Sequence, residues 1–150
     1  MTSRPDDLRL AAYRSFITAH AEVVGQIERE LSAAGVISLT WYDVLIELYE
    51  SPNRRLRLRD LARAVVLSRS GLTRTVDRLE RAGLLRREPD PTDRRGAFAV
   101  ISEDGIAAMR AAWPTYALGI VNTFARHLDD DEARVITAAF ERIRVATREG

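Results

Sequence analysis

The chain has 150 residues, 46% of them apolar and 30% charged, which suits one globular domain over 1–150 and excludes a disordered or fibrous protein. It has no cysteine and no apolar run of the roughly 18 residues that a membrane span needs, so we expect no disulfides, no membrane contact and a cytoplasmic location. The net charge is +1, yet 13 of the 23 basic residues (all arginine) and only 6 of the 22 acids lie between Ser51 and Ile101, which favours a polyanionic partner.

The N-terminal third of the chain is predicted to be helical. Apolar residues recur at helical spacing over 8–31, which predicts one long helix. Thr40 suits the N-cap of a second helix, with Asp43 as its capping-box partner. This second helix should run to about Tyr49, because Pro52 follows shortly after.

The middle of the chain carries shorter elements. Residues 55–59 alternate between arginine and leucine, which predicts a short strand. A short third helix should cover 60–65. After a turn, Ser68 suits the cap of a fourth helix that ends near Arg81, where Gly83 occupies the position of a left-handed C-terminal residue.

A hairpin is predicted to follow the fourth helix. Residues 84–88 and 97–101 have strand character, and the proline, aspartate and glycine residues of 90–96 are typical of a hairpin tip. With the earlier strand, these elements should form a small three-stranded sheet. Short helices joined by a tight turn and followed by a hairpin indicate a winged helix-turn-helix.

Two more helices should complete the chain, the fifth capped by Ser102 and the sixth opened by Asp129. The expected order is helix, helix, strand, helix, helix, strand, strand, helix, helix. The fold class is therefore mainly α (α+β), with a winged helix-turn-helix lobe over 38–101 and helical regions over 6–34 and 102–148. The apolar stripes of those helical regions need burial that a second copy would supply, so we expect a homodimer; an intrachain bundle is the alternative.

The fourth helix has two different faces. Leu72, Val76 and Leu79 share one face, which should pack inward, and polar side chains line the opposite face. A polar stripe is ordinary on any surface helix, but the turn before this helix and the hairpin after it favour contact with a DNA major groove. The candidate DNA-binding residues of this recognition helix are Ser68, Arg69, Ser70, Thr73, Arg74, Asp77 and Arg78.

The hairpin carries a second group of arginines. An exposed hairpin tip is commonly a solvated loop, but arginines at such a tip suit an adjacent minor groove. We expect Asp93 to hold the neighbouring arginine side chains by charge-assisted hydrogen bonds. The candidate DNA-binding residues of this wing are Arg86, Arg87, Asp93, Arg94 and Arg95.

These segments resemble the MarR (multiple antibiotic resistance regulator) family over most of the chain. The run LSRSGLTRTVDRLERAGL at 67–84 is similar to the recognition-helix signature of that family. The pattern of 87–105 resembles its wing, including an Asp-x-Arg element at Asp93 and Arg95, and LTWYDVL at 39–45 resembles the start of its second helix. Isoleucine and serine at 101–102 replace the usual leucine and threonine, which is a conservative departure.

The resemblance implies a homodimer with intertwined terminal helices, whose two winged lobes bind a pseudo-palindromic operator in double-stranded DNA. It implies that Arg95 is the minor-groove arginine of the wing and that Ser70, Thr73 and Arg74 face the major groove. Because the first helix has no cysteine, the peroxide-sensing branch of the family is not expected.

The resemblance also implies a repressor released by a small aromatic or lipophilic ligand bound between the dimer helices and the winged lobe. The candidate ligand-pocket residues are Tyr13, Phe16, His20, Trp41 and Tyr42, although each of them could instead fill the core or an interface.

No enzyme is expected, because His20 and His127 lack a spaced set of metal ligands and the chain has no phosphate-binding glycine loop. We therefore expect no catalytic residue, no metal and no cofactor. The alternative function is a winged-helix protein-interaction module without DNA binding. Acids on the exposed face of the fourth helix would favour that module, whereas the arginines present there favour DNA.

Overall fold

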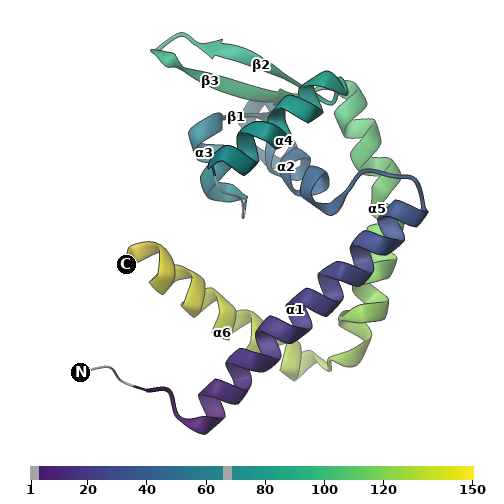
Figure 1. Ribbon diagram of the computed structural model, residues 1–150, viewed down its shortest axis with the longest axis vertical. Helices are drawn as coiled ribbons and strands as arrows, with labels where there is room; N and C mark the ends of the chain where they lie inside the picture. The colour runs from purple at the N-terminus through teal and green to yellow at the C-terminus, as the bar shows by residue number, and fades with distance from the viewer. Residues whose placement is uncertain (1–3, 66–68) are drawn as a thin grey trace. The chain divides into compact units, whose positions relative to one another are not determined.

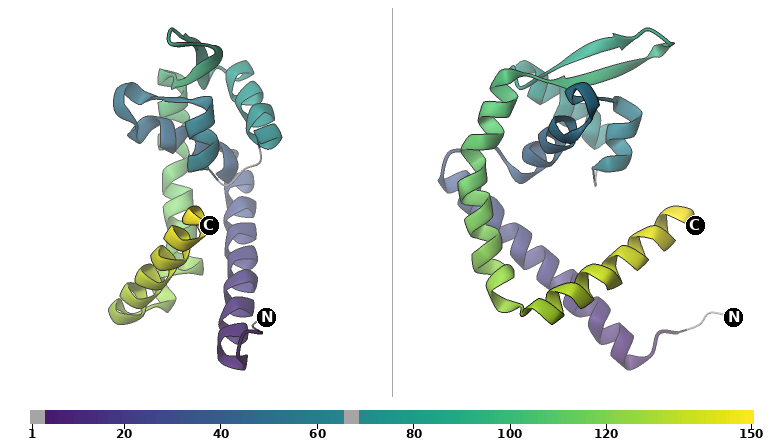
Figure 2. Two further views of the ribbon diagram at one scale, coloured as in Figure 1. Left: turned by 90° about the vertical axis from the view of Figure 1, so that its left-hand side faces the viewer. Right: turned by 180° about the vertical axis from the view of Figure 1, so that it is seen from behind.

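The computed structural model describes residues 4–65 and 69–150, and its described parts form two compact units. One unit is Ile27–Tyr116, and the other combines Met1–Gln26 with Ala117–Gly150. Figures 1 and 2 show the course of the chain. The helices and strands are α1 (Asp7–Ala33), α2 (Leu39–Glu50), β1 (Arg55–Arg57), α3 (Leu58–Ala64), α4 (Arg69–Arg81), β2 (Leu85–Asp90), β3 (Asp93–Ile101), α5 (Glu103–Thr123) and α6 (Asp130–Glu149).

The order of these elements is the predicted one, which confirms the mainly helical winged helix-turn-helix fold with a small sheet. Two single-turn 3-10 helices, Pro52–Arg54 and Ala125–His127, lie in the connections. Over the described residues, none of the helices is both long enough and apolar enough to cross a membrane.

The start of α2 differs from the prediction. Ser38, not Thr40, is the N-cap, and its side chain accepts a hydrogen bond from the backbone N–H of Trp41 at 3.2 Å. Thr40 lies inside the helix, because the apolar face of α2 already begins at Leu39, which is buried together with Tyr42. A buried residue at the first helical position requires the cap to precede it.

Two elements before the recognition helix have bounds that differ from the prediction: the strand ends two residues sooner and the short helix begins two residues earlier. Strand β1 stops at Arg57, because it pairs with β3 only over Arg55–Arg57, and α3 starts at Leu58. The predicted cap Ser68 lies outside the described residues. The end of α4 is as predicted: Gly83 has a φ of 76°, a left-handed conformation that glycine adopts without steric cost.

The sheet is antiparallel in the order β1-β3-β2. Its hairpin is longer than predicted, since β2 continues to Asp90 and β3 begins at Asp93, with only Pro91 and Thr92 between them. The predicted loop at 90–96 is therefore mostly strand. Figures 1 and 2 show this hairpin extending beyond the helices that surround its base.

The core of the molecule lies in the unit Ile27–Tyr116. Every buried apolar side chain of the described core belongs to it, and Leu45, Leu48 and Leu61 have no exposed surface. This unit is wider than the predicted lobe over 38–101, because the end of α1 and the first half of α5 also contribute buried side chains. Those side chains are Ile27, Leu31, Ile106, Met109 and Ala112.

The start of α5 is fixed closely against the end of α4. The Ser102 hydroxyl donates to the carbonyl of Gly83 at 2.6 Å and accepts from the backbone N–H of Gly105 at 3.0 Å, which confirms Ser102 as the cap. A Cβ atom on Gly105 would collide with the carbonyl oxygen of Leu84, so only glycine permits this approach. The recognition helix, the hairpin and α5 are thereby joined at one point.

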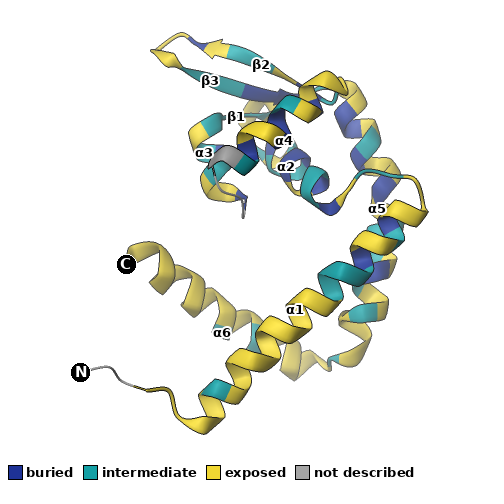
Figure 3. Cartoon of the chain, in the orientation of Figure 1, coloured by how far each residue is buried: buried dark blue, intermediate teal, exposed yellow. Residues whose placement is uncertain are grey.

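The unit made of Met1–Gln26 and Ala117–Gly150 contains most of α1, the end of α5 and all of α6. Asp129 caps α6 and forms a capping box with Glu132, in agreement with the predicted opening of this helix. Helix α6 has no buried residue, and Figure 3 shows its surface and that of α1 as largely exposed.

Candidate nucleic-acid interface

The recognition helix α4 has the two faces that its sequence predicts. Leu72, Val76 and Leu79 are buried, as is Thr75, and they fix the helix on the core of the lobe. Arg69 is the first residue of the helix, so the predicted contacts at 69 and 70 lie on its first turn. The opposite face is exposed at Thr73 and at the arginines described next.

Two arginines on the exposed face of α4 are available to a partner. Arg74 and Arg78 are both exposed and are one helical turn apart, so they project from the same side of the helix. Neither of them forms an ion pair within the part of the chain that the structure describes. Their guanidinium groups can therefore bind phosphates or base edges without first giving up an intramolecular bond.

A third predicted arginine is held inside the lobe instead. Arg87 on β2 bonds through its guanidinium to Asp77 and, at 2.7 Å, to Glu80, and its backbone N–H donates to Glu80 at 2.9 Å. The Arg87 side chain is only 28% exposed. Both carboxylates belong to α4, so this network ties the base of the wing to the recognition helix. Asp77 and Arg87 were both predicted to contact DNA, and the structure pairs them with each other.

The tip of the wing is braced by an ion pair that the sequence analysis did not identify. The Arg57 guanidinium on β1 donates to the Asp90 carboxylate at 2.7 Å, and the Asp90 side chain is only 2% exposed. Asp90 also accepts from the backbone N–H and the hydroxyl of Thr92, which closes the two-residue turn. These hydrogen bonds hold the pKa of Asp90 well below its ordinary value, and the one from Arg57 has the largest effect. The Asp90 carboxylate is therefore ionised at neutral pH and attracts the Arg57 guanidinium.

The aromatic ring of Phe98 supports the same side of the sheet. The guanidinium carbons of Arg55 and Arg57 lie 4.3 and 5.1 Å from its ring centre, within the range of cation–π contacts. The sequence signal for the Arg57–Asp90 pair was an acid at the start of the predicted hairpin tip, in a segment rich in arginine. That signal could not name the arginine, which is 33 residues away.

The wing arginines Arg94 and Arg95 are exposed and lie on β3 next to the turn. Asp93 differs from the expectation: its carboxylate accepts from the backbone N–H of Arg95 at 2.9 Å and, within the described residues, pairs with neither arginine side chain. It therefore shapes the backbone of the turn and leaves both guanidinium groups free. Arg86, on the neighbouring strand, pairs with Glu88 at 3.0 Å and stays 58% exposed.

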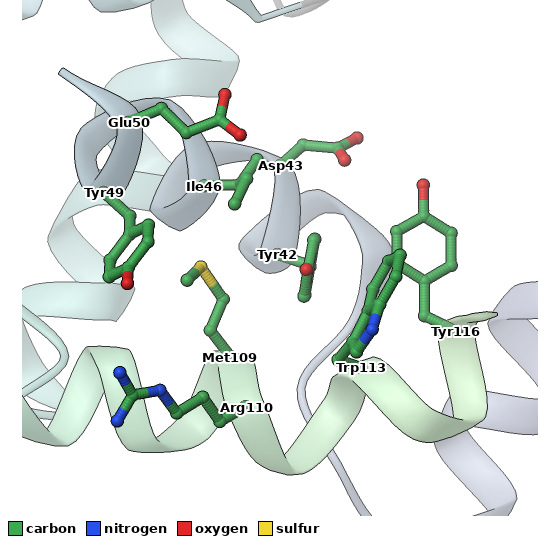
Figure 4. Close-up of a pocket in the computed structure, with 9 residues that line it drawn as sticks. All are labelled: Tyr42, Asp43, Ile46, Tyr49, Glu50, Met109, Arg110, Trp113 and Tyr116. Atoms are coloured by element: carbon green, nitrogen blue, oxygen red, sulfur yellow. The ribbon is translucent and has the colours of Figure 1, made fainter.

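The five predicted ligand-pocket residues do not line one common cavity. Phe16 and His20 line an apolar cavity of about 520 Å³ between α1 and α6, where the Phe16 and Phe140 rings are 5.1 Å apart. Tyr42 lines a separate cavity of about 570 Å³ between α2 and α5 (Figure 4). Tyr13 and Trp41 line neither of these two cavities.

The described residues contain no cluster of three or more histidine, aspartate or glutamate side chains that could hold a metal ion. The exposed arginines of α4 and the wing give the unit Ile27–Tyr116 a basic surface on these two elements. Such surfaces can bind the phosphates of a nucleic acid by electrostatic attraction and counterion release.

Comparison with known proteins gives consistent results. The family model described as MarR family matches residues 37–96. The HTH-type transcriptional regulator MhqR of Bacillus subtilis is 32% identical over 104 residues, which cover 69% of this chain and 70% of that protein.

Two solved structures from Streptomyces coelicolor are also similar over nearly the whole chain. AbsC, a MarR family transcriptional regulator, is 31% identical with a TM-score of 0.88 and covers 99% of this chain and 100% of its own. Sco3205, a MarR family transcriptional regulator solved in complex with DNA, is 27% identical with a TM-score of 0.87 and covers 96% of this chain and 90% of its own.

Proposed function

Because the chain belongs to the MarR family of transcriptional regulators, we propose that it binds a pseudo-palindromic operator in double-stranded DNA as a homodimer and represses transcription until a small ligand releases it. Like these relatives, which are transcriptional regulators, it is a regulator and not an enzyme. Since it acts on the genome, we place it in the compartment that holds the DNA, the cytoplasm.

One observation carries the proposal: exposed arginines without ion pairs among the described residues lie on the two elements that a winged helix presents to DNA. Arg74 and Arg78 lie on α4, and Arg94 and Arg95 lie on the wing. In the proposed complex α4 enters a major groove and the wing reaches the adjacent minor groove. Ser68, Arg69, Ser70 and Thr73 remain candidate contacts at the start of the recognition helix.

The networks around these arginines support the proposal. The Arg87–Asp77–Glu80 network fixes the base of the wing to α4, and the Arg57–Asp90 pair fixes the turn. Two elements held rigidly in one lobe lose little conformational freedom on binding, which favours affinity. Asp77 and Arg87 then contribute by positioning, while the exposed arginines contact the DNA.

The homodimer is proposed to form through the helical regions 6–34 and 102–148. Their exposed apolar side chains include Leu118 at 58%, Val135 at 67% and Ile143 at 59%. Exposed apolar side chains of this kind favour an interaction site, and a second copy related by a two-fold axis would cover them. Two recognition helices about one helical turn of DNA apart, roughly 34 Å, would then read a pseudo-palindrome.

Selection of bound fragments from a random duplex pool tests the proposal and identifies the operator. We expect affinity for the selected duplex to fall steeply with salt, because phosphate contacts release counterions. Arg95→Ala should weaken operator binding by about 1–3 kcal/mol and reduce the salt slope by about one. Fluorescence anisotropy titrations at several salt concentrations measure both quantities.

Arg4→Ala is the matched control, because Arg4 is also exposed but lies outside both the winged lobe and the helical regions 6–34 and 102–148; its effect should stay below about twofold. Operator affinity and salt slope unchanged by Arg95→Ala would disprove the wing contact. Absence of salt-dependent affinity for any duplex would favour the protein-interaction module over a DNA-binding regulator.

A further inference from the structure

The cavity between α2 and α5 is an aromatic box. Tyr42, Trp113 and Tyr116 form a mutually packed cluster at one end, with ring centres 5.0–6.2 Å apart. Tyr49 lies at the other end, and Figure 4 shows the open space between the two helices that these rings border. A volume of about 570 Å³ is in the range of small-molecule sites.

Trp113 is the unusual member of this cluster. Among the large apolar side chains that the described structure leaves exposed, it alone belongs to the unit Ile27–Tyr116, and it is 49% exposed. A half-exposed indole beside a buried tyrosine offers an aromatic face to a ligand. Indole is also the aromatic group that attracts cations most strongly.

The cavity is also acidic. Asp43 and Glu50 project from α2 along its upper rim, and in Figure 4 the Asp43 side chain extends toward the side where Trp113 and Tyr116 stand. Partial desolvation, together with the neighbouring carboxylates of Glu47 and Glu28, raises the pKa of Asp43 to about 6.

The tyrosines of the cavity experience the same negative potential. The pKa of Tyr42 is raised by burial and then by Glu50 and Asp43, and the pKa of Tyr116 is raised by burial, Asp43 and Tyr42. A positive charge placed among these groups would favour the ionised form of each, above all that of Asp43.

Among the described residues that line the cavity, the one cation is Arg110 on α5, and the guanidinium carbon of Arg54 lies 4.3 Å from the ring centre of Tyr49 at the other end from Trp113. The Arg110 side chain runs along α5 toward Tyr49 and away from Trp113 in Figure 4. The positive guanidinium therefore lies at the end opposite the Tyr42–Trp113–Tyr116 cluster, and the acidic, aromatic end keeps its negative character.

We propose that this cavity binds a lipophilic aromatic cation, with the positive centre between Asp43 and the ring of Trp113 and the apolar body along Tyr42 and Met109. The inference rests on the proposed function, because such a cation would be the ligand that releases the operator. It disfavours an aromatic acid as the ligand, since a carboxylate at this end would face Asp43.

Tetraphenylphosphonium and tetraphenylborate test the sign of the charge, because they have nearly the same shape and opposite charges. Isothermal titration calorimetry of the full-length chain at pH 7.5 should show tetraphenylphosphonium binding at least about tenfold more tightly than tetraphenylborate or salicylate. Asp43→Asn should weaken tetraphenylphosphonium binding about tenfold, and Trp113→Leu should weaken it severalfold. Glu141→Gln, which removes an exposed carboxylate from α6, is the matched control and should change affinity less than about twofold.

The pH dependence gives a second readout. A cation stabilises ionised Asp43, so tetraphenylphosphonium affinity should fall between pH 7 and pH 5 as Asp43 is protonated in the free protein. The groups that share this field are Glu28, Glu47, Glu50, Tyr42, Tyr116 and Arg110. The Asp43→Asn variant should show a flatter profile over the same range.

The proposal would be overturned if tetraphenylborate or salicylate bound as tightly as tetraphenylphosphonium or more tightly. It would also be overturned if the Asp43→Asn variant bound tetraphenylphosphonium with the affinity of the parent protein. Operator affinity is measured separately by anisotropy with and without tetraphenylphosphonium. Cation binding that leaves operator affinity unchanged would refute the releasing role, and a failure to bind any duplex would refute the proposed function without affecting the calorimetric result.

Discussion

In the unit Ile27–Tyr116 the apolar side chains of the described core are buried against one another, and Val44, Leu45 and Leu48 have no exposed surface. In the unit formed by Met1–Gln26 and Ala117–Gly150, helix α6 has no buried residue, and its apolar residues Val135 and Ile143 are mostly exposed. Figure 3 makes the contrast visible in the colours of the winged lobe and of α6. The first unit completes its own core, whereas the second leaves apolar side chains exposed, which the proposed dimer would cover.

The contrast separates two sources of stability. The winged unit gains its stability from burial within one chain, so its shape does not depend on association. In the proposed dimer the terminal helices would gain theirs when a second copy covers them, so their arrangement would respond to association. Substitutions of the same kind in the two units can test this separation.

The largest effect is expected from Leu48→Ala in the core of the winged unit. Removing a fully buried leucine side chain costs the transfer free energy of the lost atoms and leaves a cavity, about 2–5 kcal/mol in the free energy of unfolding. Urea denaturation at fixed protein concentration measures it. A loss below about 1 kcal/mol would mean that this unit is not closely packed, and the comparison would fail.

An intermediate effect is expected from the same substitution in the other unit, Leu118→Ala. Leu118 is 58% exposed in the single chain, so its truncation should weaken dimerisation by about 1–2 kcal/mol, roughly tenfold in the dissociation constant. Sedimentation equilibrium without DNA measures the constant, and Arg78→Ala, an exposed change on α4 outside the proposed dimer regions, is the control. An unchanged constant would place Leu118 outside the dimer interface, and a monomer at every concentration tested would favour the intrachain bundle over the dimer.

The smallest effect is expected from Asp43→Asn, which removes a charge that the winged unit holds in an unfavourable setting. The folded-state pKa of Asp43, about 6, lies above its ordinary value of 3.8, so ionisation destabilises the fold. This cost is absent below pH 3.8 and fully present above pH 6. After allowance for solvent screening at this exposed residue, the variant should be about 1 kcal/mol more stable at pH 8 and equal to the parent at pH 4.

Thermal unfolding at the two pH values checks this prediction. A stability gain that is the same at pH 4 and pH 8 would mean that the substitution acts through packing and not through charge. If the Asp43→Asn variant is more stable at pH 8 but no longer binds the cation, the Asp43 carboxylate lowers the stability of the fold while serving ligand recognition.

The sequence by itself determined the order of elements and most of their faces. Helical periodicity placed Leu72, Val76 and Leu79 inward on α4, and the capping residues Ser102 and Asp129 marked two helix starts. These features depend on residues three or four positions apart, and such short-range rules are legible in a contiguous sequence.

Tertiary structure alone decided which arginines are free. Arg87 and Arg94 look alike in the sequence, yet one is held by Asp77 and Glu80 on another element and the other is exposed. The same holds for the aromatic cavity, which joins Tyr42 to Trp113 and Tyr116 across 71 and 74 positions. Ion pairs and cavities form where elements distant in the sequence come into contact. How the core packs decides which elements meet, so the local sequence around one residue does not predict its partner.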